Sequence, residues 1–146
     1  MRVCSFNKPN DEGTRIGNYA VTKPLVPSFI FKTNQILLSI SATDFSFIAE
    51  EHLTEIFRAF AEHKVKINLT QNSAISFSIC SDNDEFKIPG LIAELKKDFK
   101  VLYNDGLRLV TIRHYEPSTI DALTKDKTII VEQRSRHTAQ VILKED

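Results

Sequence analysis

One continuous stretch decides the fold of this chain, and it runs from Gln35 to Phe99 with the sequence QILLSISATDFSFIAEEHLTEIFRAFAEHKVKINLTQNSAISFSICSDNDEFKIPGLIAELKKDF. Within it, patterns typical of short β-strands alternate with two patterns typical of amphipathic helices. Their order is strand, helix, strand, strand, helix, and a further strand pattern begins at Phe99. This order predicts an α+β protein.

Both helices of this stretch are predicted from the spacing of apolar residues. Beginning at Ala49, apolar side chains recur at helical spacing, and charged, mostly acidic side chains as far as Glu62 take the other face, which predicts a helix of about 15 residues. A second helix is predicted near residues 88–95, where Pro89 lies in the first turn and its missing N–H costs little.

A β-hairpin is predicted between the two helices. Residues 65–70 alternate apolar and polar side chains, so Asn68 should face outward, and the alternation resumes after the polar turn 71–73. The residues expected to face inward are Val65, Ile67, Leu69, Ile75, Phe77 and Ile79. Strand, helix, strand, strand, helix, strand implies a four-stranded antiparallel sheet with both helices on one face, the ferredoxin-like βαββαβ arrangement.

The remaining segments predict a second, shortened unit. The expected elements are strands at 29–31, 35–41, 99–103, 107–114, 128–133 and 138–143, turns at 33–34 and 104–106, and a short helix around 118–123. The tail after residue 104 therefore offers strand, helix, strand and strand only. We expect the upstream strand at 28–34 to supply the missing fourth strand of this second unit.

Composition excludes several classes of protein. Nineteen basic and nineteen acidic residues cancel, so the long-range field that would attract nucleic acid or an anionic membrane is missing. The chain shows no apolar run of membrane-spanning length and no apolar signal core after Met1, so we expect a cytoplasmic protein. Cys4 and Cys80 are far apart in sequence, which is typical of reduced cytosolic thiols.

No catalytic or metal-binding pattern accompanies these elements. The four glycines are too scattered to cradle a phosphate, and the four histidines show no metal spacing. Glu50 and Glu51 are adjacent on a predicted helix and so point roughly 100° apart, which prevents them from sharing a proton. Arg134, Arg136 and His137 form a small basic cluster that we expect to face solvent. Function is therefore expected in a ligand site or an interface.

Several segments, taken in order, resemble a known family. These segments are NQILLSI at 34–40, LTEIF at 53–57, VKINL at 65–69 and VLYNDGLRLV at 101–110. Together they resemble the paired ACT regulatory domains of aspartate kinases. The segment SFNKPNDEGTRI at 5–16 is similar to the end of the catalytic domain of that family.

The resemblance implies an organisation and a function. Residues 1–27 would be a connector, residues 35–104 a first ACT domain, and residues 28–34 with 105–146 a second, partial ACT domain. The chain would be the C-terminal regulatory region of an ATP-dependent L-aspartate kinase, the first enzyme of the lysine, threonine and methionine pathway. With the kinase domain absent, this chain alone is not expected to be an enzyme and needs no cofactor; ATP and magnesium would serve the kinase domain.

The resemblance also implies a ligand site and a dimer. ACT units of the family pair into homodimers and bind an amino acid where the first strand–helix loop, here 43–52, meets the neighbouring strand, here 65–73. The implied effector-binding residues are Glu51, His52, Leu53, Ile67, Asn68, Gln71 and Ser73. Such a loop can offer backbone N–H groups to a carboxylate.

The effector expected from the resemblance is threonine or lysine. Lysine-sensitive relatives carry a glycine, an aspartate and a glutamate where this chain has Glu51, Asn68 and Ala74. The loss of two carboxylates favours a neutral amino acid such as threonine.

The sequence allows three other interpretations. The chain could be a structural dimerisation module without an effector, or a free-standing amino-acid-binding regulator. An RNA-binding domain of similar topology is disfavoured, because Phe77 shares the inward phase of its strand and the net charge is zero. For His52, the alternative to a contact with the effector is an exposed position on the helix.

Overall fold

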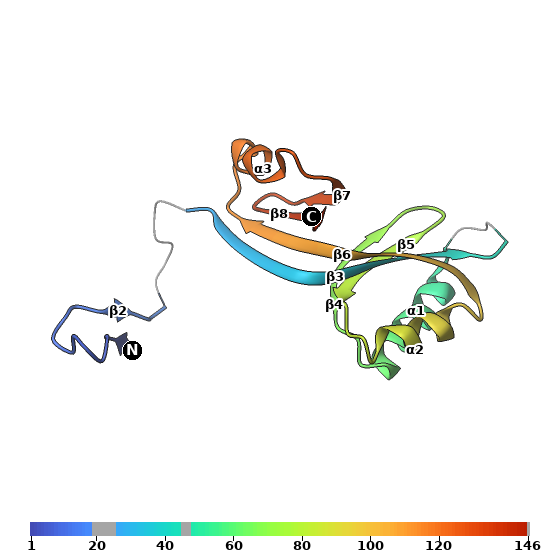
Figure 1. Ribbon diagram of the computed structural model, residues 1–146, viewed down its shortest axis with the longest axis horizontal. Coiled ribbons are helices and arrows are strands. Elements are labelled where there is room, and N and C mark those ends of the chain that lie inside the picture. Colours follow the sequence, from blue (N-terminus) through green and yellow to red (C-terminus); the bar gives the residue numbers. More distant parts are fainter. Residues whose placement is uncertain (19–25, 45–47, 146) are drawn as a thin grey trace.

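The computed structural model describes residues 1–18, 26–44 and 48–145. In this part of the chain, three helices accompany one large curved sheet, apart from a small two-stranded sheet near the N-terminus (Figure 1). The sheet has six strands in the order β4-β5-β3-β6-β8-β7, and all of its neighbouring strands are antiparallel. Along the chain, the strands of this sheet and the three helices follow in the order β3 (Ser28–Ala42), α1 (Glu50–Glu62), β4 (Ile67–Asn72), β5 (Phe77–Asp82), α2 (Ile88–Leu95), β6 (Phe99–Arg113), α3 (Pro117–Thr124), β7 (Ile129–Arg134) and β8 (Thr138–Lys144).

The first unit confirms the predicted ferredoxin-like arrangement. The strand order β4-β5-β3-β6 places β3 and β5, the first and third strands of the βαββαβ unit, at its centre, and α1 and α2 lie together on one face (Figure 1). One core joins the two helices to the sheet, and β3 contributes Ile36, Leu38 and Ile40, each at most 2% exposed. Burial of such side chains supplies the main stabilisation of the unit.

The two predicted turns at 33–34 and 104–106 do not reverse the chain. Instead β3 and β6 are each one 15-residue strand, and they pair with each other along almost their whole length. Asn34 (φ 51°) and Gly106 (φ 60°) lie where the register shifts, so each turn signal produces an irregularity within a strand. The chain does not reverse at either position, since β3 and β6 stay paired with each other on both sides of the irregularity.

The irregularity in β6 changes which of its side chains face α1 and α2. Phe99 and Val101 pack in the first core, whereas Leu107 and Leu109, an even number of residues further along, do not. Leu37 faces away from α1 and α2 and packs with Leu107 and Leu109 of β6 in a second core. The further members of this core are Leu69, Cys80, Ile142 and, partly buried, Val131. Because strands β3 and β6 belong to both halves of the sheet, this core ties the two units together.

The second unit borrows a strand, as predicted. Residues 28–32 of β3 pair with residues 109–113 of β6, which gives the order β3-β6-β8-β7 around α3. Ile120 of α3 is 1% exposed and packs on Val110 and Ile112. The strand order of the second unit, β7-β8-β6-β3, therefore repeats that of the first unit, β4-β5-β3-β6. Among the described residues, the second unit has one helix.

The predicted phase of the β4–β5 hairpin is wrong in two places. Leu69 does not share the face of Ile67, because a register shift between them turns the strand over at Asn68. Ile75 lies in the hairpin turn and is 59% exposed, since β4 continues to Asn72 and the turn spans residues 73–76.

Near the N-terminus, β1 (Arg2–Val3) and β2 (Thr14–Arg15) form a small two-stranded sheet. Figure 1 shows it apart from the six-stranded sheet. None of the helices among the described residues is long and apolar enough to cross a membrane.

Candidate functional site

The start of α1 lies against the tip of the β4–β5 hairpin. The backbone N–H of Ile48 donates a hydrogen bond of 3.1 Å to the carbonyl of Ala74. The predicted loop 43–52 thus meets the hairpin, although residues 45–47 fall outside the described part of the chain. At the N-cap position, Ala49 has no side chain that could satisfy the first N–H groups of α1. Such N–H groups suit a carboxylate ligand.

His52 helps to hold this helix start in place. Its Nδ1 accepts a hydrogen bond of 3.2 Å from the backbone N–H of Ala49, and its half-buried ring meets the ring of Phe99 edge-on at 5.8 Å between centroids. Leu53 packs against the first core, whereas Glu51 is exposed. A role of these residues in binding an effector stays a prediction.

At the hairpin, Ser73 and Gln71 make contacts within the chain, and a role of either residue in binding an effector stays a prediction. The Ser73 hydroxyl closes the turn through hydrogen bonds to the Ser76 carbonyl (3.0 Å) and from the Ser76 N–H (3.1 Å). Gln71 pairs with Ser78, on the face turned away from the helices. The residues of β4 that share the face of α1 near its start are Thr70 and Asn72, which pair with Ile79 and Phe77. Sequence alternation missed both because the shift at Asn68 reverses the phase.

Ile67 and Asn68 lie at the other end of β4. Five positions separate Asn68 from Ser73, which is roughly 16 Å along a strand. Ile67 packs against the first core between sheet and helices. The predicted effector-binding set is therefore divided between the two ends of the hairpin.

Asn68 belongs to a polar cluster that joins three strands. Its Nδ2 donates to Gln35 Oε1 and to Asp82 Oδ1, both at 2.8 Å, and its Oδ1 accepts from Lys32 Nζ at 2.7 Å. Gln35 Nε2 also donates to Asp82 Oδ1 at 2.8 Å, and Gln35 is only 1% exposed. Lys32 and Gln35 flank the irregularity of β3 at Asn34, so the cluster fixes that kink against β4 and β5.

The electrostatics of the cluster indicate a structural role. The hydrogen bond from Gln35 is the main reason that the pKa of Asp82 lies below its ordinary value, with Asn68 and Lys32 adding to the effect and burial opposing it. Burial, followed by the charge of Asp82, raises the pKa of the Cys80 thiol to about 12. A thiol with this pKa stays protonated at neutral pH, and the Cys80 side chain is 0% exposed, which is typical of a packed structural cysteine.

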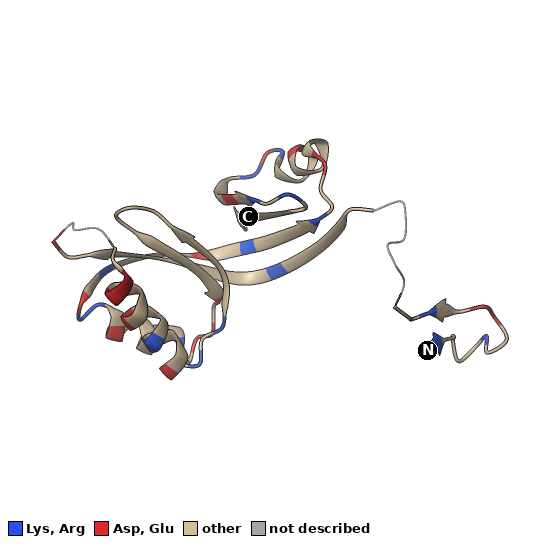
Figure 2. Cartoon of the chain, turned by 180° about the vertical axis from the view of Figure 1, so that it is seen from behind, with Lys and Arg blue, Asp and Glu red and all other residues tan. Residues whose placement is uncertain are grey.

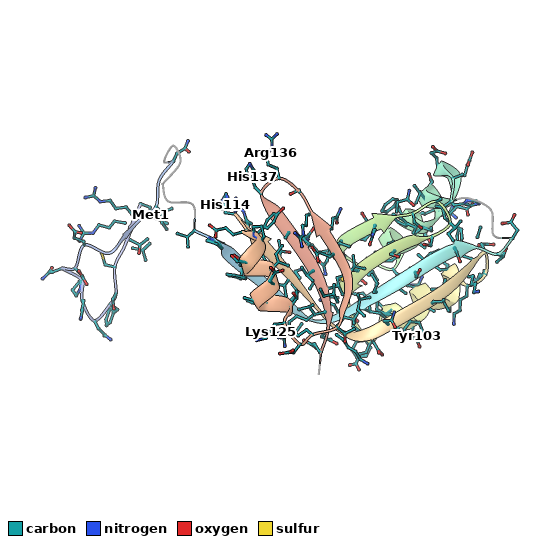
Figure 3. All side chains as sticks on the ribbon, turned by 90° about the horizontal axis from the view of Figure 1, so that it is seen from above. Met1, Tyr103, His114, Lys125, Arg136 and His137 are labelled. Atoms are coloured by element: carbon teal, nitrogen blue, oxygen red, sulfur yellow. The ribbon has the colours of Figure 1, made fainter. Side chains whose placement is uncertain are left out.

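The surface shows how charges are distributed. Figure 2 shows acidic residues along α1, and Glu50, Glu51, Glu55 and Glu62 are exposed there. In the predicted basic cluster, Arg134 pairs with Glu132, while Arg136 and His137 are exposed. Figure 3 shows Arg136, His137 and His114 at the same end of the molecule. The described residues contain no group of three or more side chains suited to a metal ion.

Comparison with known proteins gives likeness in structure alone. No model of a known protein family and no curated protein matches this sequence. Aspartokinase III of E. coli, in complex with lysine and aspartate, matches 93% of this chain with a TM-score of 0.71 and 19% identity. This chain spans only 33% of that enzyme.

Two further likenesses are to isolated regulatory units. A protein described as a C-terminal regulatory domain of aspartate kinase from Porphyromonas gingivalis matches with a TM-score of 0.66 and 14% identity, covering 82% of this chain and 86% of that one. The regulatory subunit of aspartate kinase from Thermus thermophilus matches with a TM-score of 0.55 and 12% identity, covering 80% and 86%. The chain therefore has the ACT-type fold of aspartate kinase regulatory domains.

Proposed function

We propose that this chain is the regulatory region of an aspartate kinase and that it binds an amino-acid effector. The observation that carries this proposal is the pair of ACT-type units interlocked through β3 and β6, in a fold that covers 86% of an isolated regulatory domain. The ordered sequence segments that resemble the same family support it independently.

The effector of this proposal lies where the start of α1 meets the hairpin tip. There the first-turn N–H groups of α1 can donate hydrogen bonds to the α-carboxylate, and the exposed Glu51 can pair with the α-ammonium. Thr70 and Asn72, on the same face of β4, offer polar groups for a side chain such as that of threonine. Asn68 is engaged in its own cluster and does not belong to this site.

Effector binding can reach the second unit through one strand. The loop 43–52 follows directly on β3, whose other end, residues 28–32, is the borrowed strand of the second unit. A ligand that favours one position of this loop would thereby bias the position of β3 in both units. In the parent enzyme this would transmit feedback to a kinase domain that binds ATP and magnesium in the cytoplasm.

Calorimetry of the purified chain with threonine, lysine and methionine tests this function. We expect saturable binding of one of them, with threonine favoured. Glu51→Gln should weaken binding by about two- to fivefold, as expected for one exposed ion pair. Glu55→Gln, one turn further along the same exposed face, is the matched control and should leave binding unchanged. Absence of measurable binding with all three amino acids would contradict the effector role.

The parent activity has its own test. We expect the purified chain to form no aspartyl phosphate from L-aspartate, ATP and magnesium. Formation of the product above a buffer control would contradict the assignment of catalysis to a separate kinase domain.

A structural dimerisation module is the second candidate function. Among the described residues, 28–32 of β3 pair with β6 on one side only, and Phe29, Ile30 and Phe31 are 43%, 50% and 53% exposed. An exposed apolar edge strand is a surface on which a second copy can pair. Light scattering separates the candidates, since a dimer that binds no effector supports this one and a monomer that binds effector contradicts it.

A further inference from the structure

A groove beside α2 is independent of the effector site at α1. Its volume is about 310 Å³, within the range of small-molecule sites. Its wall includes Ile88, Ile92 and Tyr103, and Figure 3 shows Tyr103 on the length of β6 that passes α2. Ile88 is 4% exposed and Tyr103 is 51% exposed, so the wall is a buried apolar base beside an accessible aromatic ring.

Acidic side chains lie at one end of this groove. Glu85 precedes the first turn of α2. Asp105 lies in β6 between Asn104, which pairs with Leu37, and Leu107, which pairs with Gln35. Gln35 also pairs with Asp82 at the end of β5, which brings Asp105 close to the start of α2. Both carboxylates therefore line the groove near the helix N-terminus.

A single lysine lies at the other end. Lys96 directly follows the last residue of α2, and the eight residues of this helix span about 12 Å. Within the described ranges, Glu85, Asp105 and Lys96 form no ion pair with another side chain. The groove thus combines a negative end, an apolar middle and a positive end.

We propose that this groove binds an ω-amino carboxylic acid, an aliphatic chain with an ammonium group at one end and a carboxylate at the other. The ammonium lies between Glu85 and Asp105, the methylene chain packs on Ile92 and Tyr103, and the carboxylate meets Lys96. An α-amino acid cannot satisfy both ends through its α-groups, because these are joined through one carbon atom. Free lysine binds less well, since its α-ammonium approaches Lys96.

Chemical-shift mapping with 6-aminohexanoate tests the proposal. We expect saturable shifts of the backbone amides of Ile88, Ile92, Lys96 and Tyr103. Hexylamine and hexanoate, which each lack one charge, should bind at least about threefold more weakly, as for the loss of one exposed ion pair. Absence of saturable shifts in the groove, or equal binding of hexanoate, would overturn the proposal.

Two variants test the charged ends separately. Lys96→Gln should lower the affinity for 6-aminohexanoate to that for hexylamine, and Glu85→Gln combined with Asp105→Asn should lower it to that for hexanoate. Lys97→Gln is the matched control, because Lys97 is the next residue, is exposed and does not line the groove. An equal loss with Lys97→Gln would show an unspecific charge effect and reject the site. Since 6-aminohexanoate has no α-ammonium, its result is separate from that of the α-amino-acid calorimetry.

Discussion

Asn68 obtains its hydrogen-bond partners from its own chain. The sequence alternation predicts an outward-facing Asn68, free to contact a ligand or a partner strand, whereas the structure gives it Lys32, Gln35 and Asp82. Alternation could not reveal this, because the partners come from strands that are 14 to 36 residues away. A satisfied half-buried amide of this kind contributes to stability and to the uniqueness of the fold.

Replacement of Asn68 by alanine tests that role. Because Asn68→Ala removes three hydrogen bonds and leaves the buried Gln35 short of a partner, we expect the free energy of unfolding to fall by about 1–3 kcal/mol. Urea denaturation followed by circular dichroism measures it. Asn72→Ala, at an exposed position of the same strand, is the control and should stay within about 0.5 kcal/mol of the original protein. Equal effects of both changes would contradict the role of the cluster.

Asp82 should make stability depend on pH in the acid range. Because its folded-state pKa lies below the ordinary value of 3.8, the folded protein holds the carboxylate in its charged form more readily than the unfolded chain. The resulting stabilisation is fully present above the ordinary pKa and is lost as the pH falls through the folded-state pKa. We therefore expect Asp82→Asn to be less stable than the original protein at pH 6, with the difference shrinking below about pH 4.

Denaturation curves across this pH range provide the measurement. Asp98→Asn, a change at an exposed carboxylate outside the cluster, is the control for a general effect of charge. A stability difference between Asp82→Asn and the original protein that stays constant through the whole acid range would contradict the argument.

At the scale of the elements, prediction succeeded where periodicity was long and failed where a strand was irregular. Helices α1 and α2 follow from apolar spacing, and the ferredoxin-like arrangement of the first unit follows from the order of its elements along the chain. The turn signals at Asn34 and Gly106 predict chain reversals that the structure does not have, because a residue with positive φ can shift the register of a strand as well as reverse a chain. Only the pairing of β3 with β6, a non-local interaction, decides between these outcomes.

Gly106→Ala tests the cost of the irregularity in β6. A Cβ at this position would meet no atom within 4 Å, so the cost comes only from the backbone conformation at φ 60°. We expect a loss of about 1 kcal/mol in the free energy of unfolding. Gly106→Asn, which tolerates the left-handed region better, should lose less than half of that. An unchanged stability of Gly106→Ala would show that residue 106 does not require positive φ.

At the scale of the whole molecule, two units share β3 and β6 and one core. Leu37 and Cys80 of the first unit pack with Leu109 and Ile142 of the second. Because this core is closely packed, a displacement of one unit would also displace side chains of the other. The borrowed strand was predictable, because the tail offers one strand fewer than the first unit. The charged groove along α2 was not predictable, since Glu85, Lys96 and Asp105 come together only through the packing of α2 on β6.

The structure separates one part of the predicted effector site from the rest. Local sequence placed Glu51, His52 and Leu53 at the start of α1, where the structure has them. The resemblance to aspartate kinases implies that Asn68 and Ser73 belong to one effector site. The reversal of β4 at Asn68 and the length of the strand separate the two residues.

The proposed α-amino-acid effector binds where α1 begins and the β4–β5 hairpin turns. Titration of the ¹⁵N-labelled chain with threonine and then with lysine, followed by amide chemical shifts, tests it most directly. We expect saturable shifts that centre on Glu50–Leu53 and on Thr70–Ser76, followed by smaller shifts along β3. Saturation with shifts confined to other parts of the molecule, or no saturable shift with either amino acid, would contradict it.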